Sequence, residues 1–381
     1  MEFWELGGRG FSRMVLAAGF ACAAIVLSAP WAIRFGLVDR PRGRRQHKHA
    51  VPLTGGFAIF AAFALVYLAS APRIEAPLLY SLLLPAGVLL VAGILDDLFE
   101  LSAVFKLLFQ AAAVLIAVLL GDLRIDSLGN LFGGGEIVLG AWAVPFTVFA
   151  VVGVINAVNM IDGMDGLAAM IVIAALGWLA VSALSMGATA QITLMLILAG
   201  AVAGFLVFNF RLPWRHQAEV FMGDSGSAVL GFLLAWFAIH LSQGAGSALY
   251  PISAVWILGL PIMDALALIL RRPLHGRNPM AGARDHVHHV LFGSGLCYRA
   301  TISTLVISSA MCGAVGVYGS LFRVPEHFLF ASLLAVFGGH LVYTELRSRG
   351  WLGRHRGLAG GPRSERADAA AAKGARPLMD A

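Results

Sequence analysis

Long apolar runs dominate this sequence and leave few folds open to it. Runs of about 17–25 residues can cross a bilayer as helices, and the sequence contains eleven of them. They lie at residues 12–33, 53–71, 76–95, 103–120, 137–157, 167–186, 189–209, 226–242, 249–269, 301–321 and 327–345. Charged residues make up only 13% of the chain, against roughly 25% in soluble domains. These features predict an all-α, polytopic integral membrane protein with about eleven transmembrane helices.

Lysine and arginine gather in alternate connections between the apolar runs. The richer side carries Arg40, Arg42, Arg44, Arg45, Lys48, Arg211, Arg215, Arg271, Arg272, Arg277, Arg284, Arg299 and the segment from Arg347. By the positive-inside rule, these connections and the C-terminus lie in the cytoplasm and the N-terminus in the periplasm. Arg9 and Arg13, with Ser28-Ala29-Pro30, resemble a signal peptide. The five basic residues after the first run outnumber them, which favours an uncleaved span.

In this interpretation residues 1–346 form one transmembrane domain and residues 347–381 form a disordered cytoplasmic tail. The tail is basic and rich in Gly and Ala, without an apolar period, and it suits contact with anionic headgroups. The net charge of +6 belongs to no soluble basic domain, so we expect no nucleic acid partner. Cys22, Cys297 and Cys312 lack the spacing of a disulfide framework or a thiolate metal site.

Carboxylates, amides and imidazoles interrupt the apolar pattern in four connections on the same predicted side. An ionisable cluster beside a membrane span is costly to bury and therefore indicates a functional site. The residues are Asp96 and Asp97 after the third run, Asn156, Asn159, Asp162 and Asp165 at the end of the fifth, Asp224 at the start of the eighth, and Asp264, His286, His288 and His289 after the ninth. The spacing of Asn156 and Asn159 puts both amides on one helical face. Together these residues predict one active site that faces the cytoplasm.

Each motif also has a simpler structural interpretation. The Asp96-Asp97 pair can be a solvated helix end, and Lys106 can extend its amine to the headgroups. Gly223-Asp224-Ser225-Gly226 matches the segment around a trypsin-like serine, but its flanks are membrane spans, which disfavours that interpretation. The His cluster can bind zinc, but no Cys or second His cluster lies nearby in sequence, and Arg284 repels a cation.

Carboxylate and amide oxygens without thiolates favour Mg²⁺, or Mn²⁺ as a substitute, over zinc. Mg²⁺ commonly uses one or two carboxylates and completes its shell with water and substrate phosphates. Imidazoles and arginine on the same side suit an anionic phosphate or a sugar ring. The residues thus predict a soluble, phosphate-bearing substrate that meets a lipid at the membrane surface.

The order of these motifs resembles the polyprenyl-phosphate N-acetylhexosamine-1-phosphate transferases. That family carries an Asp-Asp pair, an Asn-x-x-Asn-x-x-Asp-Gly-x-Asp-Gly-Leu signature, a Phe-Met-Gly-Asp-x-Gly-Ser signature and a His-rich cytoplasmic loop. The corresponding segments are Asp96-Asp97, Asn156 to Leu167, Phe221 to Ser227 and His286 to His289, with family-like segments at Leu37 to Pro41, Arg44 to His47 and Pro52 to Gly56. The resemblance extends from about Leu37 to about Leu291.

The resemblance implies transfer of a sugar-1-phosphate from a UDP-N-acetylhexosamine to undecaprenyl phosphate in the bacterial inner membrane, with release of UMP. It implies Mg²⁺ at Asp224 and Asp97, with Asp96 and Asp97 near the lipid phosphate and one of them acting as base. It further places Asn159, Asp162 and Asp165 at the nucleotide and pyrophosphate, Lys106 at the lipid phosphate, His286, His288 and His289 at the pyrophosphate or sugar, and His47, Asn156 and Arg284 among the substrate-binding residues.

Such a reaction exchanges one phosphoanhydride for another, so it needs mostly positioning and charge neutralisation. We expect direct, in-line attack by the lipid phosphate and an equilibrium constant near unity. The His286-Val287-His288-His289 loop resembles that of enzymes that start O-antigen, teichoic-acid or related glycans, commonly from UDP-GlcNAc. The peptidoglycan enzyme instead has three consecutive histidines.

Several alternatives stay open at this point. Ala283-Arg284-Asp285 departs from the Asp-Arg-x that many UDP-GlcNAc enzymes carry before the His cluster. UDP-QuiNAc, UDP-FucNAc, UDP-GalNAc and UDP-MurNAc-pentapeptide are therefore further candidate donors. A secondary transporter with acidic residues on its substrate path, a catalytically silent homologue and a homodimeric assembly are also open.

Overall fold

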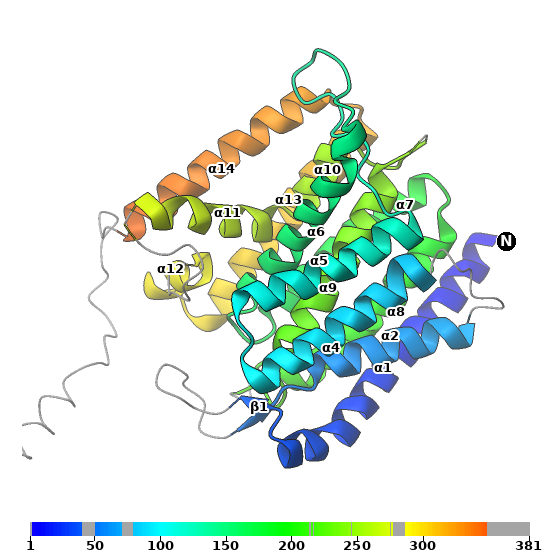
Figure 1. Cartoon of the computed structure of the whole chain (residues 1–381), viewed down its shortest axis with the longest axis vertical. Helices are drawn as coiled ribbons and strands as arrows, with labels where there is room; N and C mark the ends of the chain where they lie inside the picture. The colour runs from blue at the N-terminus through cyan, green and yellow to red at the C-terminus, as the bar shows by residue number, and fades with distance from the viewer. Residues whose placement is uncertain are drawn as a thin grey trace, which may run out of the picture.

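The computed structural model describes residues 2–39, 50–70, 79–212, 215, 217–244, 246–274, 276 and 286–348, and most of them are helical (Figure 1). The helices are α1 (Glu2–Phe35), α2 (Gly55–Ser70), the π-helical turn η1 (Leu79–Leu83) that continues as α4 (Leu84–Phe99), α5 (Ala103–Gly121), the short η2 (Gly140–Trp142), α6 (Ala143–Ile161), α7 (Leu167–Ser185), α8 (Thr189–Asn209), α9 (Gly223–Ser242), α10 (Pro251–Ile257), α11 (Gly259–Leu274), α12 (Val287–Gly293), α13 (Tyr298–Leu321) and α14 (Glu326–Ser348). Two short strands, β1 (Val38–Asp39) and β2 (Val51–Pro52), pair antiparallel.

Within these residues, nine helices are long and apolar enough to cross a membrane, and a tenth span results if α10 and α11 count as one. The prediction of a polytopic, all-α membrane protein is therefore confirmed. The count of eleven is met only in part, because α2 has 16 residues and falls short of a full span. Of the expected tail, residues 347–381, the first two still belong to α14, and residues 349–381 lie outside the described residues.

The run expected as a straight span at 249–269 is broken instead. Helices α10 and α11 meet at an angle of 83° around Leu258. Pro261 explains the break, because proline has no N–H to donate to the Ile257 carbonyl and its ring clashes with that carbonyl. Helix α11 consequently leaves the direction of α10 and runs toward the C-terminal end of α14 (Figure 1).

Helix α9 forms the centre of the bundle. Nearly every one of its residues is buried, and α2, α4, α6 and α7 pack around it. A helix that is apolar on all sides belongs in the core of a helical assembly. The N-terminal residue of α9, Gly223, has a left-handed φ of 75°, which glycine adopts without strain.

Small residues let α2 and α4 approach the start of α9. A Cβ on Gly56 would overlap the backbone of Gly226, and a Cβ on Gly93 would overlap the backbone of Ser225. Close packing through small residues is typical of membrane helices. Because Gly93 lies one turn before Asp97, this contact brings the end of α4 beside Asp224.

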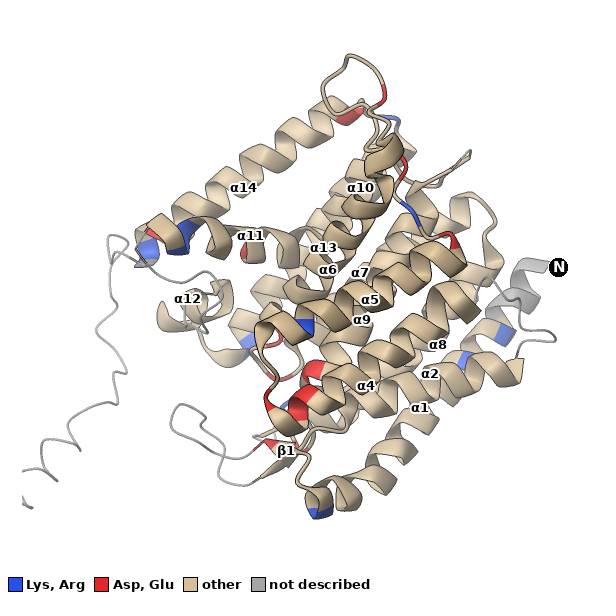
Figure 2. Ribbon diagram, in the orientation of Figure 1, with Lys and Arg blue, Asp and Glu red and all other residues tan. Residues whose placement is uncertain are grey.

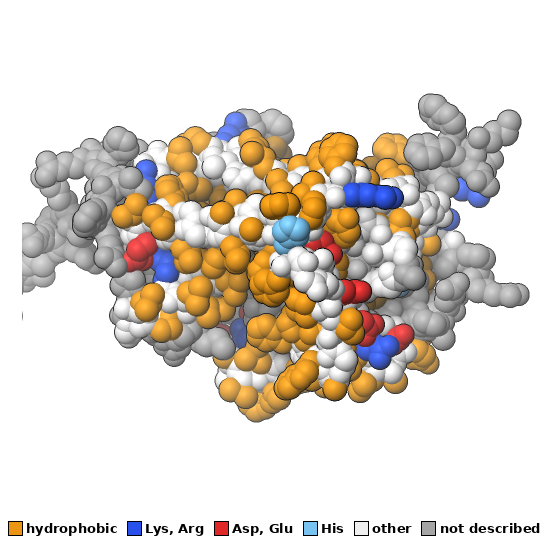
Figure 3. All heavy atoms as spheres, turned by 90° about the horizontal axis from the view of Figure 1, so that it is seen from above, with side chains coloured by type: hydrophobic (Ala, Val, Ile, Leu, Met, Phe, Trp, Pro, Cys, Tyr) orange, Lys and Arg blue, Asp and Glu red, His pale blue; other side chains and the backbone are white. Residues whose placement is uncertain are grey.

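Acidic side chains concentrate at the end of the bundle where α4 ends and α9 begins (Figure 2). The opposite end, seen in Figure 3, is dominated on its visible face by hydrophobic side chains with a few charged ones among them. The three sequence segments that contain Asp96, Asp162 and Asp224 therefore meet at one end of the molecule, as the sequence predicted.

The close contact between α4 and α9 predicts that a single methyl group at Gly93 is destabilising. We expect Gly93→Ala to lower the stability of the folded bundle by about 1–3 kcal/mol through overpacking, although alanine favours helices. Gly153→Ala in α6 is the matched control, since a Cβ there meets nothing within 4 Å. Thermal unfolding of the two variants in detergent would contradict the packing argument if their midpoints were equal.

Candidate active site

A cavity of ≈ 1120 Å³ opens at the acidic end of the bundle. Among the described residues it is lined by seven acidic side chains and two basic ones: Asp39, Asp96, Asp97, Glu100, Asp162, Asp165 and Asp224 against Lys106 and Arg211. An excess of carboxylates in one cavity is unfavourable without cations. The lining therefore fits a ligand or cofactor that brings positive charge.

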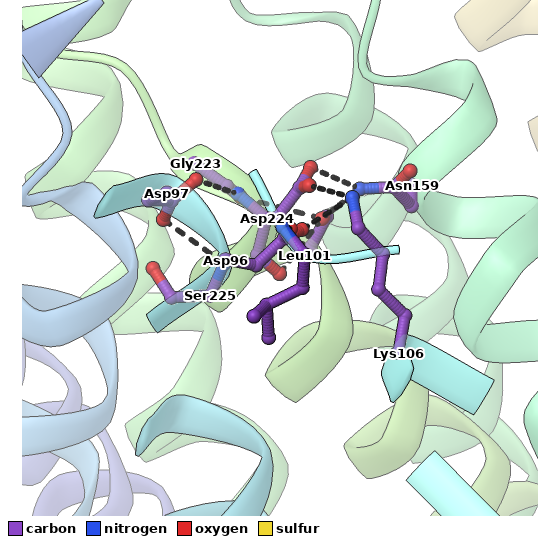
Figure 4. Close-up of polar contacts among 9 residues, drawn as sticks. Asp96, Asp97, Leu101, Lys106, Asn159, Gly223, Asp224 and Ser225 are labelled. Atoms are coloured by element: carbon purple, nitrogen blue, oxygen red, sulfur yellow. Dashed lines mark hydrogen bonds and ion pairs between the residues drawn. The ribbon is translucent and has the colours of Figure 1, made fainter. Parts of the chain in front are cut away.

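Lys106 joins the two carboxylates that come from different helices (Figure 4). Its Nζ forms an ion pair with Asp96 and lies 3.0 Å from Oδ2 of Asp224. The backbone N–H of Leu101 donates to Asp96 Oδ1 at 2.8 Å, so that carboxylate is held from two sides. The alternative in which Lys106 merely reaches toward the headgroups is wrong, because its amine points into the site.

Asn159 holds Asp224 from the side of α6. Its Nδ2 donates to Asp224 Oδ1 at 2.7 Å and to Ser227 Oγ at 2.8 Å. Asn156 lies one turn earlier and donates instead to Gln110 Oε1 at 2.7 Å. Both amides line a small adjoining cavity, which confirms their common helical face, but only Asn159 also lines the main cavity.

Asp97 holds the first turn of α9. Its two carboxylate oxygens accept hydrogen bonds from the backbone N–H groups of Asp224, at 2.9 Å, and Ser225, at 3.3 Å (Figure 4). These N–H groups have no partner inside the helix, so a carboxylate here acts as an N-terminal cap and interacts favourably with the helix dipole. Asp97 thereby fixes the backbone that carries Asp224.

The turn between α6 and α7 carries the other two acidic residues of the motif. Burial raises the pKa of Asp162 to about 7, and the neighbouring carboxylates of Asp224, Asp165 and Asp97 act in the same direction. No described residue donates a hydrogen bond to the Asp162 carboxylate. It is thus the member of the group whose charge is least compensated by the chain itself.

Asp165 is held by two residues outside the predicted motifs. Arg211 Nε donates to Asp165 Oδ2 at 2.6 Å, and the Arg211 guanidinium lies over the ring of Tyr298, 4.4 Å from its centroid. The Tyr298 hydroxyl donates to the Asp165 carbonyl. These contacts tie the turn to the end of α8 and the start of α13.

Asn209 links this turn to the segment before α9. Its Oδ1 accepts from Gly166 N–H at 2.6 Å, and its Nδ2 donates to the Val220 carbonyl at 2.8 Å. Gly166 has a φ of 81°, which requires glycine. The carbonyls of Phe221 and Met222 then accept from Gly55 and Gly56 at 3.0 Å, so the start of α2 also holds this segment.

The histidines of the predicted loop lie beside the site rather than on the wall of its main cavity. His288 is buried against Gly163, the residue after Asp162. Burial lowers the pKa of His288 to about 3, with His289 and His286 acting in the same direction, so its ring is neutral at pH 7. His286 Nδ1 lies 3.0 Å from Asp264 Oδ2, and the ring centroids of His288 and His289 are 4.2 Å apart.

The structure thus brings together the predicted residues Asp96, Asp97, Lys106, Asn159, Asp162, Asp165 and Asp224 around one cavity. His47 and Arg284 lie outside the described residues. Four further residues belong to the site although no sequence motif marked them: Gln110, Asn209, Arg211 and Tyr298. Asn209 follows an apolar run just as Asn156 and Asn159 do, which is a signal that could have marked it.

The described residues contain no group of three or more acidic, His or Cys side chains that is already arranged to hold a metal ion. Mg²⁺ does not need such a cage, since it is usually bound by one or two carboxylates, water and substrate phosphates. The oxygen donors and excess negative charge of the cavity fit this ion. Asp224 and Asp162 both line the cavity and could contribute carboxylate oxygens to it.

A helical membrane bundle with a carboxylate-lined cavity at one end defines the class of this protein. Residues 78–242 match the model of the family described as "Glycosyl transferase family 4". The chain is similar to proteins named undecaprenyl-phosphate alpha-N-acetylglucosaminyl 1-phosphate transferase. The Haemophilus influenzae relative is 34% identical over 83% of this chain and 89% of its own length. The Pasteurella multocida relative is 34% identical over 87% of this chain and 91% of its own length. The Escherichia coli strain K12 relative is 32% identical over 84% of this chain and 85% of its own length.

The chain therefore belongs to the polyprenyl-phosphate N-acetylhexosamine-1-phosphate transferase family. The predicted resemblance to this family is thus confirmed over most of the chain. The transporter alternative required acidic residues in the middle of broken helices, whereas Asp96, Asp162 and Asp224 lie at helix ends.

The cap formed by Asp97 predicts a structural cost for its removal. We expect Asp97→Ala to lower stability by about 1–2 kcal/mol, the usual cost of losing a helix N-terminal cap. Asp126→Ala is the control, because Asp126 is exposed and its carboxylate has only a 3.8 Å ion pair with Arg124 in the described chain. Equal unfolding temperatures for both purified variants would show that Asp97 does not support α9.

Proposed function

We propose that this protein transfers N-acetylhexosamine-1-phosphate, most simply GlcNAc-1-phosphate, from a UDP-sugar to undecaprenyl phosphate and releases UMP. The observation that carries the proposal is the convergence of Asp96, Lys106, Asn159, Asp162 and Asp224 on one cavity in a chain of this family. The names of the relatives support the lipid acceptor and the sugar.

We further propose that Mg²⁺, with Mn²⁺ as a substitute, is held by Asp224 together with Asp162, and that Asp97 acts mainly through the backbone of Asp224. When bound, the ion neutralises the pyrophosphate of the donor and the charge that develops on the leaving UMP. The crowding of the buried Asp162 carboxylate by those of Asp224, Asp165 and Asp97 supports this, because a cation would offset their mutual repulsion. Direct coordination by Asp97 stays a prediction.

The cation of Lys106 is the described group best placed to receive the phosphate of the lipid acceptor. It already bridges Asp96 and Asp224, so an incoming phosphate would compete with those carboxylates for the same amine. Asp96 would accept the remaining proton of the phosphate. An oxygen of the lipid phosphate then attacks the β-phosphorus of the donor, and the bond from that phosphorus to the bridging oxygen breaks, releasing UMP.

Arg211 supplies the second positive charge of the described lining. Its guanidinium is stacked on Tyr298 and bound to Asp165, which fixes its orientation at the cavity wall. A planar, fixed guanidinium is suited to bidentate phosphate binding. We propose that it faces the nucleotide portion of the donor.

The setting of the reaction is also part of the proposal. We infer that the acidic end faces the cytoplasm of a bacterial inner membrane, with the N-terminus in the periplasm, and that the product initiates a cell-surface glycan such as an O-antigen. The basic connections of the sequence support that orientation. UDP-QuiNAc, UDP-FucNAc, UDP-GalNAc and UDP-MurNAc-pentapeptide are the other donors to be compared.

The direct experiment measures UMP release by purified protein with Mg²⁺ and undecaprenyl phosphate across these donors and UDP-GlcNAc. We expect lipid-dependent release with UDP-GlcNAc, and reversal when UMP is added. UMP release with only a different donor would change the proposed sugar and glycan but not the proposed reaction. No release with any donor would contradict the proposed function.

Asp224→Asn tests the proposed metal ligand. The substitution keeps the hydrogen-bonding shape but removes the charge, so we expect turnover to fall by at least about a hundredfold, with little change in thermal stability. Glu219→Gln, at an exposed residue outside the lining, serves as the control. Wild-type turnover by Asp224→Asn at limiting Mg²⁺ would refute the metal role of Asp224.

A further inference from the structure

Asp264 is a carboxylate on α11 that lies beyond the bend and outside the main cavity. Its side chain is 2% exposed, so its charge is costly unless other groups compensate it. The proposed chemistry gives this residue no direct part. Its hydrogen bonds nevertheless all lead toward the histidine loop and the C-terminal helix.

Asp264 holds two consecutive residues at the start of α12. Its Oδ1 accepts from Val287 N–H at 2.9 Å, and its Oδ2 lies 3.0 Å from His286 Nδ1. Val287 is the first residue of α12, whose backbone N–H has no partner within the helix. One buried carboxylate thus fixes both the backbone and a side chain at the point where the loop begins.

Helix α14 places a second imidazole near the same carboxylate. His340 Nε2 lies 3.8 Å from Asp264 Oδ1, and Arg271 Nε donates to Glu345 Oε2 at 2.9 Å between α11 and α14. The bent helix α11 and the slanting helix α14 therefore form a common support for α12 (Figure 1). The contacts are made by residues of a helix pair that lies outside the matched family region.

The other side of α12 contacts the active site. His288 packs against Gly163 so closely that a Cβ on that glycine would overlap the imidazole ring. Gly163 follows Asp162 and lines the main cavity together with it. A shift of α12 would therefore be transmitted to the turn that carries Asp162, because a packed contact of this kind leaves no free space.

We propose that Asp264 is a positioning residue for the transfer reaction: it anchors α12 to α11 and α14 and so holds His288 against the Asp162–Gly163 turn. The effect of Asp264 on catalysis rests on the proposed function, whereas its anchoring of α12 rests on these contacts alone. It predicts that the hydrogen-bonding pattern of Asp264 matters, while its charge does not take part in the chemistry.

Two substitutions separate these features. Asp264→Asn keeps an oxygen that accepts from Val287 N–H and places an amide N–H donor opposite His286 Nδ1. Asp264→Leu has a similar volume and removes both hydrogen bonds. We expect Asp264→Leu to lower kcat by about 10- to 100-fold, the effect of a misplacement of about 1 Å, with a KM for the UDP-sugar within about twofold of wild type. Asp264→Asn should restore most of kcat.

A double-mutant cycle shows through which residue Asp264 acts. If His288 transmits the effect, His288→Ala combined with Asp264→Leu should be no worse than the more damaging single variant. Thr344→Val is the matched control, since Thr344 is equally buried on α14 but its hydroxyl bonds only to carbonyls of its own helix. Fully multiplicative losses in the cycle would overturn transmission through His288.

Hydrogen exchange of residues 286–293, measured on the full-length protein in detergent without substrate, keeps the test independent of activity. We expect faster exchange in Asp264→Leu and wild-type exchange in Asp264→Asn and Thr344→Val. Unchanged exchange in Asp264→Leu, or equal losses of kcat in the Asn and Leu variants, would overturn the proposal. A wild-type protein that fails to turn over any donor would refute the proposed function, while the exchange result would still decide the role of Asp264.

Discussion

The position of Asp224 depends on the packing of the first turn of α9 against α2 and α4. Gly56 and Gly93 let backbones approach so closely that no side chain fits between them, and Asp97 supplies acceptors for the N–H groups of that turn. Asp224 is consequently presented at a fixed point of a buried helix, between Lys106 and Asn159. A site for phosphoryl transfer needs such fixed charges more than it needs a strong nucleophile.

The remaining walls of the site are fixed by residues that have structural partners of their own. Asn209 joins the turn after α6 to the segment before α9, and Arg211 with Tyr298 holds Asp165 from α8 and α13. Each of these side chains forms a hydrogen bond across two elements that are far apart in the sequence. The carboxylates can therefore be crowded into one cavity because the backbone around them is held at many points, which limits the relaxation that like charges would otherwise cause.

Much of this architecture was predictable from the sequence, and the exceptions have physical reasons. The apolar runs predicted most of the helices. Asp96, Asp162 and Asp224 each lie at an end of such a run, and successive spans alternate in direction, so the sequence also predicted that the three share one side. The bend around Leu258 was missed although Pro261 marks it, since hydropathy alone is the same for a straight and a broken apolar run. The capping role of Asp97 and the orientation of Asn156 toward Gln110 were also beyond prediction, because adjacent residues of one motif can point to different partners and only tertiary packing decides between them.

The central claim is that these convergent carboxylates bind a divalent cation together with a nucleotide diphosphate. Electron paramagnetic resonance of Mn²⁺, titrated into the purified full-length protein with and without UDP, tests it most directly. The account predicts one Mn²⁺ site per chain whose affinity rises when UDP is present and which Mg²⁺ displaces. Mn²⁺ binding that is absent, or that is insensitive to both UDP and Mg²⁺, would contradict it.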